Sequence, residues 1–502
     1  MTKYILAHDI GTSGNKASLF STEGEAIKNV TINFDTNYMF DNRAEQNPLD
    51  WWKAVCESTK QLLSNINKSN IAAVSFSGQM MGCLCVDKQG QLLRDSIIYS
   101  DQRSVEETKI ISSKIEQKKF YKICGHRASP VYSLEKLMWI KKNEPDIYKK
   151  TFKMLNAKDY LIFRLTGKYC TDHSDASGTN AYDIRLRNWS SKIIDIADIE
   201  QDKFPEIYDS TTVIGEVSKK AAEETSIPIR TPVVIGAGDG SSAGVGVGCI
   251  SPGNLYSCIG TSAWIATTTT EPFYDEKMQT MTWAHAIPNL YHPSGSMQAA
   301  GACYRWIRDE ICKDESSEGY KRGINPYQII DKEVESSVAG ANGIIFLPYL
   351  MGERSPYWNP KAKGAFIGIK LTNKKEDLLR AVVEGVCFNL KTIFEIFSAK
   401  SKYDHLTLVG GVAKGGIWQQ ILADILGVKV LIPNYLEEAT SIGAAVIGGV
   451  GIGELKDFKD VNKFIKINKV IKPNIEAKKV YKETHKIFKE TYLSLLDIFN
   501  KI

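Results

Sequence analysis

A tight turn of glycine and hydroxyl residues, set between two apolar segments, occurs twice in this sequence. The first copy lies in "HDIGTSGNK" at 8–16, and "IGTS" recurs at 259–262, about half a chain later. Each copy has the pattern of a strand, a tight turn and a second strand. Two copies of one α/β unit that face each other would form a cleft with a glycine turn on each wall. The repeat therefore predicts two domains, which we place at residues 1–249 and 250–502.

Strand and helix patterns alternate through both halves. Residues 71–78 ("IAAVSFSG") predict a buried strand, and residues 48–66 carry apolar side chains at helical spacing. In the second half, residues 405–411 ("HLTLVGG") predict a strand, and 414–427 predict an amphipathic helix. A Lys/Glu-rich helix is expected from residue 476 onward. The fold class expected from these patterns is α/β.

Composition and charge narrow the range of partners. The 63 basic and 58 acidic residues leave a net charge of +5 that is spread along the chain, which argues against a nucleic-acid partner. Ten cysteines lack metal-ligand spacing, so zinc is not expected and a reducing compartment is favoured. No apolar run approaches the roughly 20 residues of a membrane helix. The first apolar stretch ends at His8 and Asp9, unlike a signal peptide. A cytoplasmic location is therefore expected.

The first turn has the residues of a phosphate and metal site. Its glycines permit tight backbone geometry with exposed amides, and Thr12 and Ser13 add hydroxyl donors. Asp9, directly before the turn, is placed to hold Mg²⁺, either directly or through water. Lys16 can reach a phosphate or can be a solvated surface lysine. The pattern also fits an ordinary hairpin turn, so its function depends on the second copy.

The second turn repeats the phosphate-binding residues but not the carboxylate. Cys258 stands where Asp9 stands in the first copy, while Gly260 and Thr261 remain. Both turns can therefore bind phosphate, but only the first can position a metal ion. This asymmetry suits a nucleotide that lies across a cleft with one end bound to metal. Two unrelated hairpins are the alternative.

A third motif, "IGAGDGSSAGVG" at 235–246, places Asp239 at a strand end among glycines. There its carboxylate would face open space and could accept a proton from a substrate hydroxyl, or it could cap a helix. The same stretch contains G-x-S-x-G with Ser242 at its centre, a pattern found at the nucleophile of serine hydrolases. That hypothesis leaves both glycine turns unexplained.

A fourth motif favours a flat ligand near the end of a later strand. Gly410 and Gly411 end the strand predicted at 405–411 and permit close approach of such a ligand. The helix that begins near Gly416 offers its N-terminus nearby. An adenine or a ribose can rest there. Trp418 has the spacing of a helix-packing residue.

Taken together, these motifs resemble those of the FGGY carbohydrate kinase family, most closely its xylulokinase-like branch. Residues 364–385 ("GAFIGIKLTNKKEDLLRAVVEG") follow the C-terminal signature of the family. Residues 133–143 ("SLEKLMWIKKN") follow the earlier signature, except that Val131 takes a position that is usually aromatic or small. The segments 347–356 ("LPYLMGERSP") and 172–179 ("DHSDASGT") also look like xylulokinase sequence. The resemblance covers nearly the whole chain.

The resemblance implies two ribonuclease-H-like, actin-like ATPase domains that flank a deep interdomain cleft and close over Mg-ATP and a sugar. It implies that Asp239 is the catalytic base and that Asp9 takes part in catalysis. Asp9 and Asp239 would together form the Mg²⁺ site. The expected nucleotide contacts are Thr12, Ser13 and Lys16 on one wall, Gly260 and Thr261 on the other, and Gly410, Gly411 and Ala413 at the adenosine.

The sugar contacts are where the sequence departs from the family pattern. Xylulokinases typically have Gln-Met-His-Gly where this chain has Gln79, Met80, Met81 and glycine, and a thioether cannot donate a hydrogen bond to a sugar oxygen. The usual Trp-Asn-Asp is replaced by Tyr-Ser-Asp, which ends at Asp101, and Gly240 follows the base where Asn or Gln is common. Glycerol kinases have Arg-Glu at the two methionines, which argues against glycerol. The expected sugar contacts are Gln79, Met80, Met81, Asp101 and Asp239.

The sequence thus predicts an ATP-dependent kinase that phosphorylates a hydroxyl of a ketose, with D-xylulose as the first choice and D-xylulose 5-phosphate as the product. Ribulose, erythritol and gluconate-like substrates are alternatives. An actin-like ATPase without a sugar substrate, or a sugar-sensing protein without turnover, would use the same cleft. A homodimer is expected only from the family.

Overall fold

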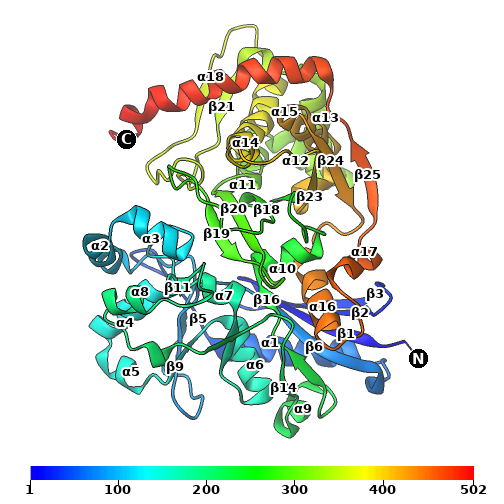
Figure 1. Ribbon diagram of the computed structural model, residues 1–502. Helices are drawn as coiled ribbons and strands as arrows, with labels where there is room; N and C mark the ends of the chain where they lie inside the picture. The colour runs from blue at the N-terminus through cyan, green and yellow to red at the C-terminus, as the bar shows by residue number, and fades with distance from the viewer. Residues whose placement is uncertain (1) are drawn as a thin grey trace.

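The computed structural model of the chain describes residues 2–502, which form two seven-stranded sheets, one in each half. The N-terminal sheet has the order β14-β15-β6-β1-β2-β3, with β16 paired to β6, and the C-terminal sheet has the order β19-β20-β18-β17-β23-β24-β25. Figure 1 shows the two sheets in a lower and an upper half of the molecule. The N-terminal strands are β1 (Tyr4–Ile10), β2 (Gly14–Ser21), β3 (Ala26–Asn33), β6 (Ile71–Gly78), β14 (Val213–Glu216), β15 (Pro232–Val234) and β16 (Ala237–Gly238). The C-terminal strands are β17 (Leu255–Ile259), β18 (Ala263–Thr267), β19 (Met281–Ala284), β20 (Tyr291–Met297), β23 (His405–Val409), β24 (Lys429–Pro433) and β25 (Ile467–Ile471).

The two glycine turns occupy equivalent places in the two sheets. β1 and β2 form an antiparallel hairpin, and β1 also pairs in parallel with β6. In the same way β17 and β18 form an antiparallel hairpin, and β17 pairs in parallel with β23. Asp9 pairs with Lys16 just before the first turn, and Cys258 pairs with Trp264 just before the second. The repeat in the sequence is therefore a repeat of structure.

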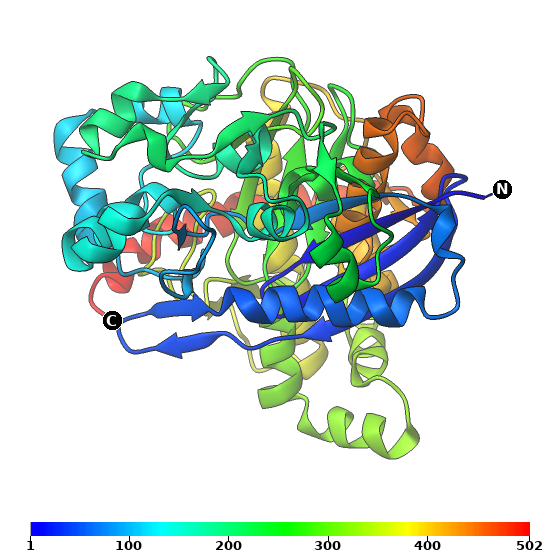
Figure 2. The same cartoon turned by 90° about the horizontal axis from the view of Figure 1, so that it is seen from below.

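The N-terminal sheet is covered on both faces by helices. Alternate residues of a strand point to opposite faces. Leu6 and Ile10 of β1 pack in the same core as Trp51 of α1 (Pro48–Leu63), which begins at the Asn47 N-cap. Ile5, from the other face, packs in a core with Ile442 of α16 (Ala439–Gly451). Figure 2 shows α1 running along one face of the strands. A helix from the C-terminal half thus completes the layer over the N-terminal sheet.

The contact between α10 (Asp239–Gly246) and α16 joins the halves at their centre. A Cβ atom on Gly246 would lie 1.7 Å from the carbonyl oxygen of Ala439, and one on Gly443 would lie 1.9 Å from that of Ser242. Glycine is therefore needed on both helices for this close approach. The glycines that follow Asp239 belong to α10, and the neighbouring helix leaves no room for side chains at Gly246.

Smaller elements extend each half. A helical lobe with its own core around Phe120, Leu137 and Ile140 lies on the N-terminal half (Figure 1). In the C-terminal half, the long helices α14 (Lys375–Ser398), α15 (Gly416–Leu426) and α18 (Ile475–Phe499) share one core with the sheet, and α18 matches the helix expected from residue 476. The lobe contains α2 (Val105–Lys114), α3 (Gln117–Cys124), α4 (Ser133–Asn143), α5 (Pro145–Lys150) and α8 (Ser191–Ile196), whereas α6 (Ala157–Thr166) packs in the core of the N-terminal sheet and α7 (His173–Ser177) contacts β16. Other elements are β4 (Asn37–Met39), β5 (Arg43–Gln46), β7 (Leu84–Val86), β8 (Ser96–Ile97), β9 (Lys153–Leu155), β10 (Cys170–Asp172), β11 (Tyr182–Asp183), β12 (Asn188–Trp189), β13 (Glu206–Tyr208), α9 (Lys219–Thr225), α11 (Gly301–Trp306), α12 (Lys313–Arg322), α13 (Pro326–Ser336), β21 (Ile345–Leu347), β22 (Ala365–Ile367) and α17 (Val461–Phe464).

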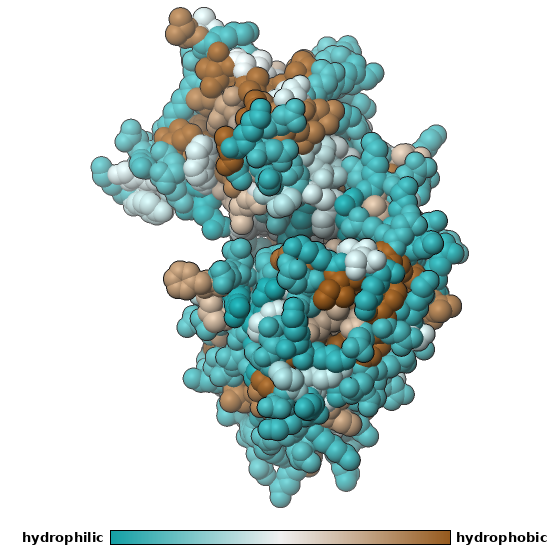
Figure 3. All heavy atoms as spheres, turned by 90° about the vertical axis from the view of Figure 1, so that its left-hand side faces the viewer, coloured by the Kyte–Doolittle hydropathy of each residue, from teal (hydrophilic) through white to brown (hydrophobic). Residues whose placement is uncertain are grey.

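The surface is hollowed between the two halves when the molecule is viewed in space-filling form (Figure 3). Within residues 2–502, no helix combines the length and apolar character that a membrane crossing requires.

Candidate active site

The two candidate carboxylates lie at strand ends on either side of β6. Asp9 pairs with Ser77 on one side of β6, and Gly238, directly before Asp239, pairs with Gly78 on the other. The two groups are close enough for the negative charge of Asp9 to raise the pKa of Asp239. The topology thus brings together two residues that are 230 positions apart in the sequence (239 minus 9).

Asp239 has the properties of a general base near neutral pH. Burial first, and then the charge of Asp9, raise the pKa of Asp239 to about 7, although the Gly240 amide donates a 2.6 Å hydrogen bond to Oδ1. Apart from its chain neighbours and the backbone of α10, no heavy atom lies within 4 Å of the position that a Cβ on Gly240 would take. The carboxylate therefore has open space beside it and a pKa that suits proton transfer. The ordinary pKa of an aspartate, near 4, would have made it a much weaker base.

Asp9 is held by a residue from the C-terminal half. Thr440 Oγ1 donates a 2.6 Å hydrogen bond to Asp9 Oδ2. Burial raises the pKa of Asp9, while the hydrogen bonds from Thr440 and Ser77 and the charge of Lys16 lower it. Lys16 Nζ donates to the carbonyl oxygen of Glu437 at 2.8 Å, so this lysine links the two halves. Contact of Lys16 with a phosphate stays a prediction.

The donor set around Asp9 and Asp239 fits Mg²⁺. Mg²⁺ keeps several waters and is commonly bound through one or two carboxylates together with substrate phosphates. The charge of Asp9 raises the proton affinity of Asp239, and a divalent cation between the two carboxylates would relieve this repulsion. Within residues 2–502 there is no cluster of three or more His, Cys, Asp or Glu residues that could enclose a metal without help from a ligand.

The two turns differ in what surrounds their hydroxyl groups. In the first turn, Thr12 Oγ1 donates to the Tyr99 hydroxyl at 3.3 Å, and Ser13 is exposed. In the second turn, Thr261 Oγ1 accepts a 2.9 Å hydrogen bond from Arg305 of α11. Arg305 was not found by the sequence reasoning, because it lies outside the glycine motif. It supplies the second turn with the cation that the first turn obtains from Lys16.

The residues expected at the adenosine lie beside the second turn. Gly410 has φ +96°, and a Cβ atom there would be 2.5 Å from the carbonyl oxygen of Ile259. Only glycine allows this contact between the ends of β23 and β17. Ala413 is buried, and its carbonyl oxygen accepts a 2.7 Å hydrogen bond from Gln419. Gly411 and Ala413 belong to the short helical turn Gly411–Lys414, which follows β23 directly.

The loop after β6 connects the expected sugar contacts to the first turn. The Gln79 amide donates to the carbonyl oxygen of Ile10 at 2.7 Å, and its side chain donates to Gln46, which in turn donates to the carbonyl oxygen of Thr12 at 2.6 Å. Gln79 Oε1 is buried without a hydrogen-bond partner within residues 2–502. This oxygen is therefore available to accept a hydrogen bond from a ligand.

The two methionines of this loop have different roles. A Cβ atom on Gly238 would lie 2.6 Å from Met80 Sδ, so Met80 packs against the strand that leads to Asp239. Met81 has φ +63°, which is uncommon for a residue with a side chain, and its carbonyl oxygen accepts a 2.7 Å hydrogen bond from the fully buried Lys136. Burial lowers the pKa of Lys136 to about 7. The hydrogen bond from Lys136 thus fixes the backbone at Met81.

Asp101 is fully buried and already well bonded. Its carboxylate accepts hydrogen bonds from the Arg103 guanidinium at 2.7 to 3.0 Å and from the amide of Ala44 at 2.6 Å. A sugar contact by Asp101 stays a prediction, and a sugar hydroxyl would have to share the oxygens with these donors.

A buried ionic cluster supports β16, the strand that leads to Asp239. Lys158 lies 2.8 Å from Asp159, 2.9 Å from Asp172 and 3.3 Å from Asp175. Ser174 Oγ donates to Asp172 at 2.5 Å and accepts a 2.9 Å hydrogen bond from the amide of Gly238. The sequence reasoning used 172–179 only as a family signature. The clustering of Asp172 and Asp175 around Lys158 of α6 could not be predicted from the sequence.

An aromatic wall from both halves lies beside Met80. His126 stacks on Tyr132 with ring centroids 4.4 Å apart, and Trp283 of β19 lies 4.9 Å from the His126 ring. A Cβ atom on Gly178 would contact both Met80 and Trp283. His126 Nδ1 is buried without a hydrogen-bond partner within residues 2–502. This wall was also missed, because its members come from two distant segments of the chain.

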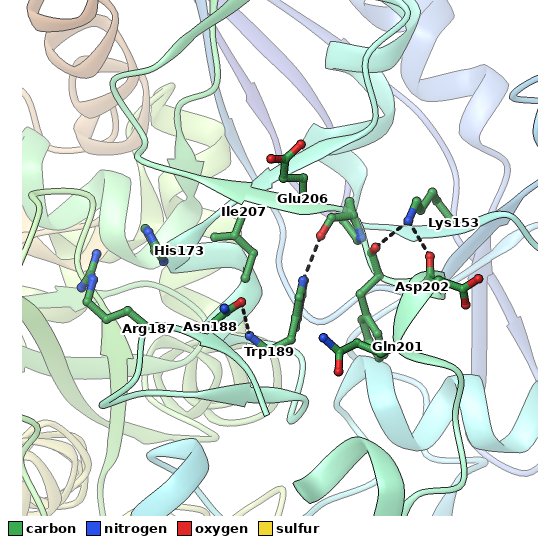
Figure 4. A pocket seen from close by; sticks show the side chains of 11 residues that line it. Lys153, His173, Arg187, Asn188, Trp189, Gln201, Asp202, Glu206 and Ile207 are labelled. Carbon is green, nitrogen blue, oxygen red and sulfur yellow. Dashed lines mark hydrogen bonds between the residues drawn. The ribbon is translucent and has the colours of Figure 1, made fainter. Parts of the chain in front are cut away.

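A separate cavity of about 660 Å³ lies in the N-terminal half (Figure 4). Its lining contains none of the residues expected to bind nucleotide or sugar. Lys153 and Trp189, at its wall, already donate to backbone carbonyl groups of Phe204 and Pro205. The lining residues are Lys153, His173, Arg187, Asn188, Trp189, Gln201, Asp202, Phe204, Pro205, Glu206 and Ile207.

Ser242 does not have the setting of a hydrolase nucleophile. It is fully buried within α10, and its hydroxyl donates to the carbonyl oxygen of Thr440 at 2.9 Å. The serine therefore helps to attach α10 to α16, and the G-x-S-x-G pattern comes from the glycines of that contact.

Comparison with known proteins gives consistent matches. Models of the FGGY family of carbohydrate kinases match residues 4–246 (N-terminal domain) and 255–452 (C-terminal domain). A gluconokinase of Bacillus licheniformis is 31% identical, with 97% of this chain and 95% of the relative covered. A xylulose kinase of Bacillus subtilis (strain 168) is 30% identical, with 99% and 98% covered. The crystal structure of a ligand-bound xylulose kinase from Lactobacillus acidophilus matches with a TM-score of 0.93 at 27% identity over 99% of each chain. The expected fold class, two actin-like domains around a cleft, is confirmed.

Proposed function

The chain belongs to the FGGY family of carbohydrate kinases, and we propose that it uses Mg-ATP to convert D-xylulose to D-xylulose 5-phosphate. Kinases of this family are ATP-dependent phosphotransferases that act on small sugars. In this proposal, residues 1–249 and 250–502 are the two halves that close over the substrates.

One observation carries the proposed chemistry: the strand ends around β6 bring the Asp239 carboxylate, which has open space beside it, close to Asp9. In the proposed step, Asp239 accepts the proton of the sugar hydroxyl while that oxygen attacks the γ-phosphorus of ATP, and ADP leaves. Asp9 and Asp239 would hold Mg²⁺, which neutralises charge on the phosphates when it is bound. Ser13 and the amides of the first turn would face the phosphates from one side, and Thr261 and Arg305 from the other. Closure of the halves would exclude water and limit hydrolysis of ATP.

The neutral polar groups near Asp239 support an uncharged sugar. Gln79 Oε1 and His126 Nδ1 are buried within residues 2–502 without partners, and both can accept a hydrogen bond, since His126 Nε2 donates to the carbonyl oxygen of Ser177. Tyr132 and Trp283 give a flat apolar surface against which the C–H groups of a sugar can pack. A ketose such as D-xylulose presents both hydroxyl and C–H surfaces.

Gluconate is a second candidate because a cation, Arg354, lies near the aromatic wall described above. The charge of Arg354 lowers the pKa of Tyr132, although burial raises it more. The adjacent Glu353 is buried, and burial raises its pKa to about 8, so it does not neutralise Arg354 at pH 7. An uncompensated guanidinium could bind the carboxylate of an aldonate.

The test is ADP release measured with D-xylulose, D-ribulose, erythritol, glycerol, gluconate and no sugar, together with mass detection of the phosphorylated product. We expect D-xylulose to give the highest kcat/KM and a product that carries one phosphate. A higher kcat/KM with gluconate would move the assignment to the second candidate. ADP release that is independent of every sugar would overturn the kinase proposal and favour an actin-like ATPase.

A further inference from the structure

Three segments of the C-terminal half meet behind the second turn. The amide of Gly301, at the start of α11, donates to the carbonyl oxygen of Gly260 at 2.9 Å. A Cβ atom on Gly301 would lie 2.4 Å from that oxygen and 3.3 Å from Val412 Cγ2. The second turn, α11 and the segment after β23 therefore converge at one point. A nucleotide whose phosphates lie at the second turn would extend its base between α11 and the segment after β23.

The carboxylate of Asp331 lies near this contact point and is held there by Tyr304. Tyr304, one turn along α11 from Gly301, donates its hydroxyl to Asp331 Oδ1 at 2.5 Å. Asp331 Oδ2 lies 3.0 Å from the position that a Cβ on Gly415 would take. Because Gly415 has no side chain, the carboxylate of α13 approaches the backbone at the point where residues 411–416 turn into α15. Next to it, Gly416 has no heavy atom within 4 Å of its Cβ position, so the space there is open.

The second oxygen of Asp331 is a free acceptor in an aromatic setting. Within residues 2–502, no lysine, arginine or histidine nitrogen forms an ion pair with Asp331, whereas 28 ion pairs are formed elsewhere. The ring of Tyr304 stacks on Tyr327 at 5.2 Å and meets Trp418 edge-on at 5.2 Å. These rings belong to the core of the C-terminal half and hold the carboxylate in place, so a flat base that reaches it would find one hydrogen-bond acceptor at its edge.

We propose that Asp331 Oδ2 accepts a hydrogen bond from the 6-amino group of adenine and thereby selects ATP over 6-oxopurine nucleotides. The inference rests on the proposed nucleotide site and adds a specificity-determining residue to it. The amino group of adenine is a donor, whereas the 6-oxo group of guanine or hypoxanthine is an acceptor and would face the carboxylate with its lone pairs. A site that is built for a donor rejects a ligand that lacks one, since the bound ligand would cover the acceptor and leave it unpaired.

The experiment measures nucleotide binding by calorimetry in the presence of Mg²⁺ and the absence of sugar. The ligands are ATP, ITP and purine riboside triphosphate, which has hydrogen at position 6. The wild-type protein should bind ATP at least about tenfold more tightly than either analogue, as expected for a hydrogen bond to a charged group. D331N should lower the ratio of ATP to ITP affinity to about one, because an amide can also donate to the 6-oxo group.

Glu335→Gln is the matched control. Glu335 lies on the same helix and is exposed, and its charge raises the pKa of Asp331 without a hydrogen bond to it. We expect E335Q to keep the wild-type ratio. An E335Q effect as large as that of D331N would overturn the proposal in favour of a general charge effect, and so would a folded D331N with an unchanged ratio.

The wild-type protein alone also tests the proposal. Equal affinity for ATP and purine riboside triphosphate would overturn it even if D331N does not fold. Because binding is measured without sugar, failure to find a phosphorylated sugar would count against the proposed substrate and leave the assignment of Asp331 standing. Failure to bind any of the three nucleotides would overturn both.

Discussion

Thr440 Oγ1 donates a 2.6 Å hydrogen bond to Asp9 Oδ2, which joins the start of α16 to the end of β1 across 431 positions of sequence. α16 packs on α10, whose first residue is Asp239. Both candidate catalytic carboxylates are therefore positioned by the same pair of helices. Because these helices connect the two halves, movement of the halves and the geometry of the site are coupled.

Thr440→Val should weaken the use of Mg²⁺. Valine keeps the shape of threonine but loses the donor, so the pKa of Asp9 rises further and its ionised form becomes less available to a cation. We expect the Mg²⁺ concentration for half-maximal ADP release to rise by about tenfold, the usual value of one hydrogen bond to a charged group. Thr440→Ser keeps the hydroxyl and should behave like the wild type. Equal effects of the valine and serine variants would show that the hydroxyl has no such role.

Ser174→Ala should reduce turnover as well as stability. The hydroxyl of Ser174 connects the amide of Gly238 to Asp172, so its loss leaves a buried N–H without a partner directly before Asp239. We expect kcat to fall by about tenfold with the KM for ATP unchanged, and the free energy of unfolding to fall by about 1–3 kcal/mol.

Ser210→Ala is the control for the Ser174 variant. Ser210 Oγ donates to the same oxygen of Asp172 at 2.9 Å, whereas the amide of Gly238 is bonded to Ser174. The Ser210→Ala variant should lose stability, while its kcat stays within about twofold of the wild-type value. If both variants lost turnover equally, the cluster would act on stability and not on the position of Asp239.

Glu135 should make the protein less stable as the pH rises. Burial raises the pKa of Glu135 from 4.5 to about 7, and its Oε2 has no hydrogen-bond partner within residues 2–502. The folded state therefore keeps a proton that the unfolded state loses above pH 4.5. The stabilisation is fully present below pH 4.5 and is lost as the pH rises through 7, at up to about 1.4 kcal/mol per pH unit.

Urea unfolding of the wild type and of Glu135→Gln between pH 4.5 and 8 measures this effect. The glutamine variant keeps the size of the side chain but cannot ionise, so its stability should change less with pH over this range. A parallel pH dependence of the two proteins would mean that Glu135 is not protonated in the folded state.

Met81→His should increase activity toward D-xylulose. The change restores an imidazole donor where xylulokinase sequences have one, and histidine is among the residues that tolerate the positive φ of this position. We expect kcat/KM for D-xylulose to rise by about 2–13-fold, as for one neutral hydrogen bond. Met81→Leu removes the sulfur without adding a donor and should not increase it. A decrease with histidine would indicate that the natural substrate needs an apolar contact there.

The parts of the fold that follow local rules could be predicted from the sequence. Both glycine turns, the strand at 71–78 and the helix around Trp51 were found because alternation, helical spacing and turn residues are local signals. The same holds for the carboxylate before the first turn and for the one in the glycine-rich stretch.

Contacts between distant segments could not be predicted. Arg305 at the second turn, the ion pairs of Lys158 and the bond from Thr440 to Asp9 each depend on how separate elements pack. The need for glycine at 246 and 443 comes from the close approach of two helices, which no local pattern shows. The pKa of Asp239 likewise depends on burial and on Asp9, which only the fold brings near.

The most direct test of the account is the rate of sugar phosphorylation by Asp239→Asn, measured by mass detection of the product at saturating ATP and sugar. Asparagine keeps the shape of the side chain but cannot accept the proton. The account predicts a loss of at least about 1000-fold in kcat, within the range expected for a general base, with nucleotide affinity within about threefold of the wild type. Retention of more than a tenth of the wild-type kcat would contradict it.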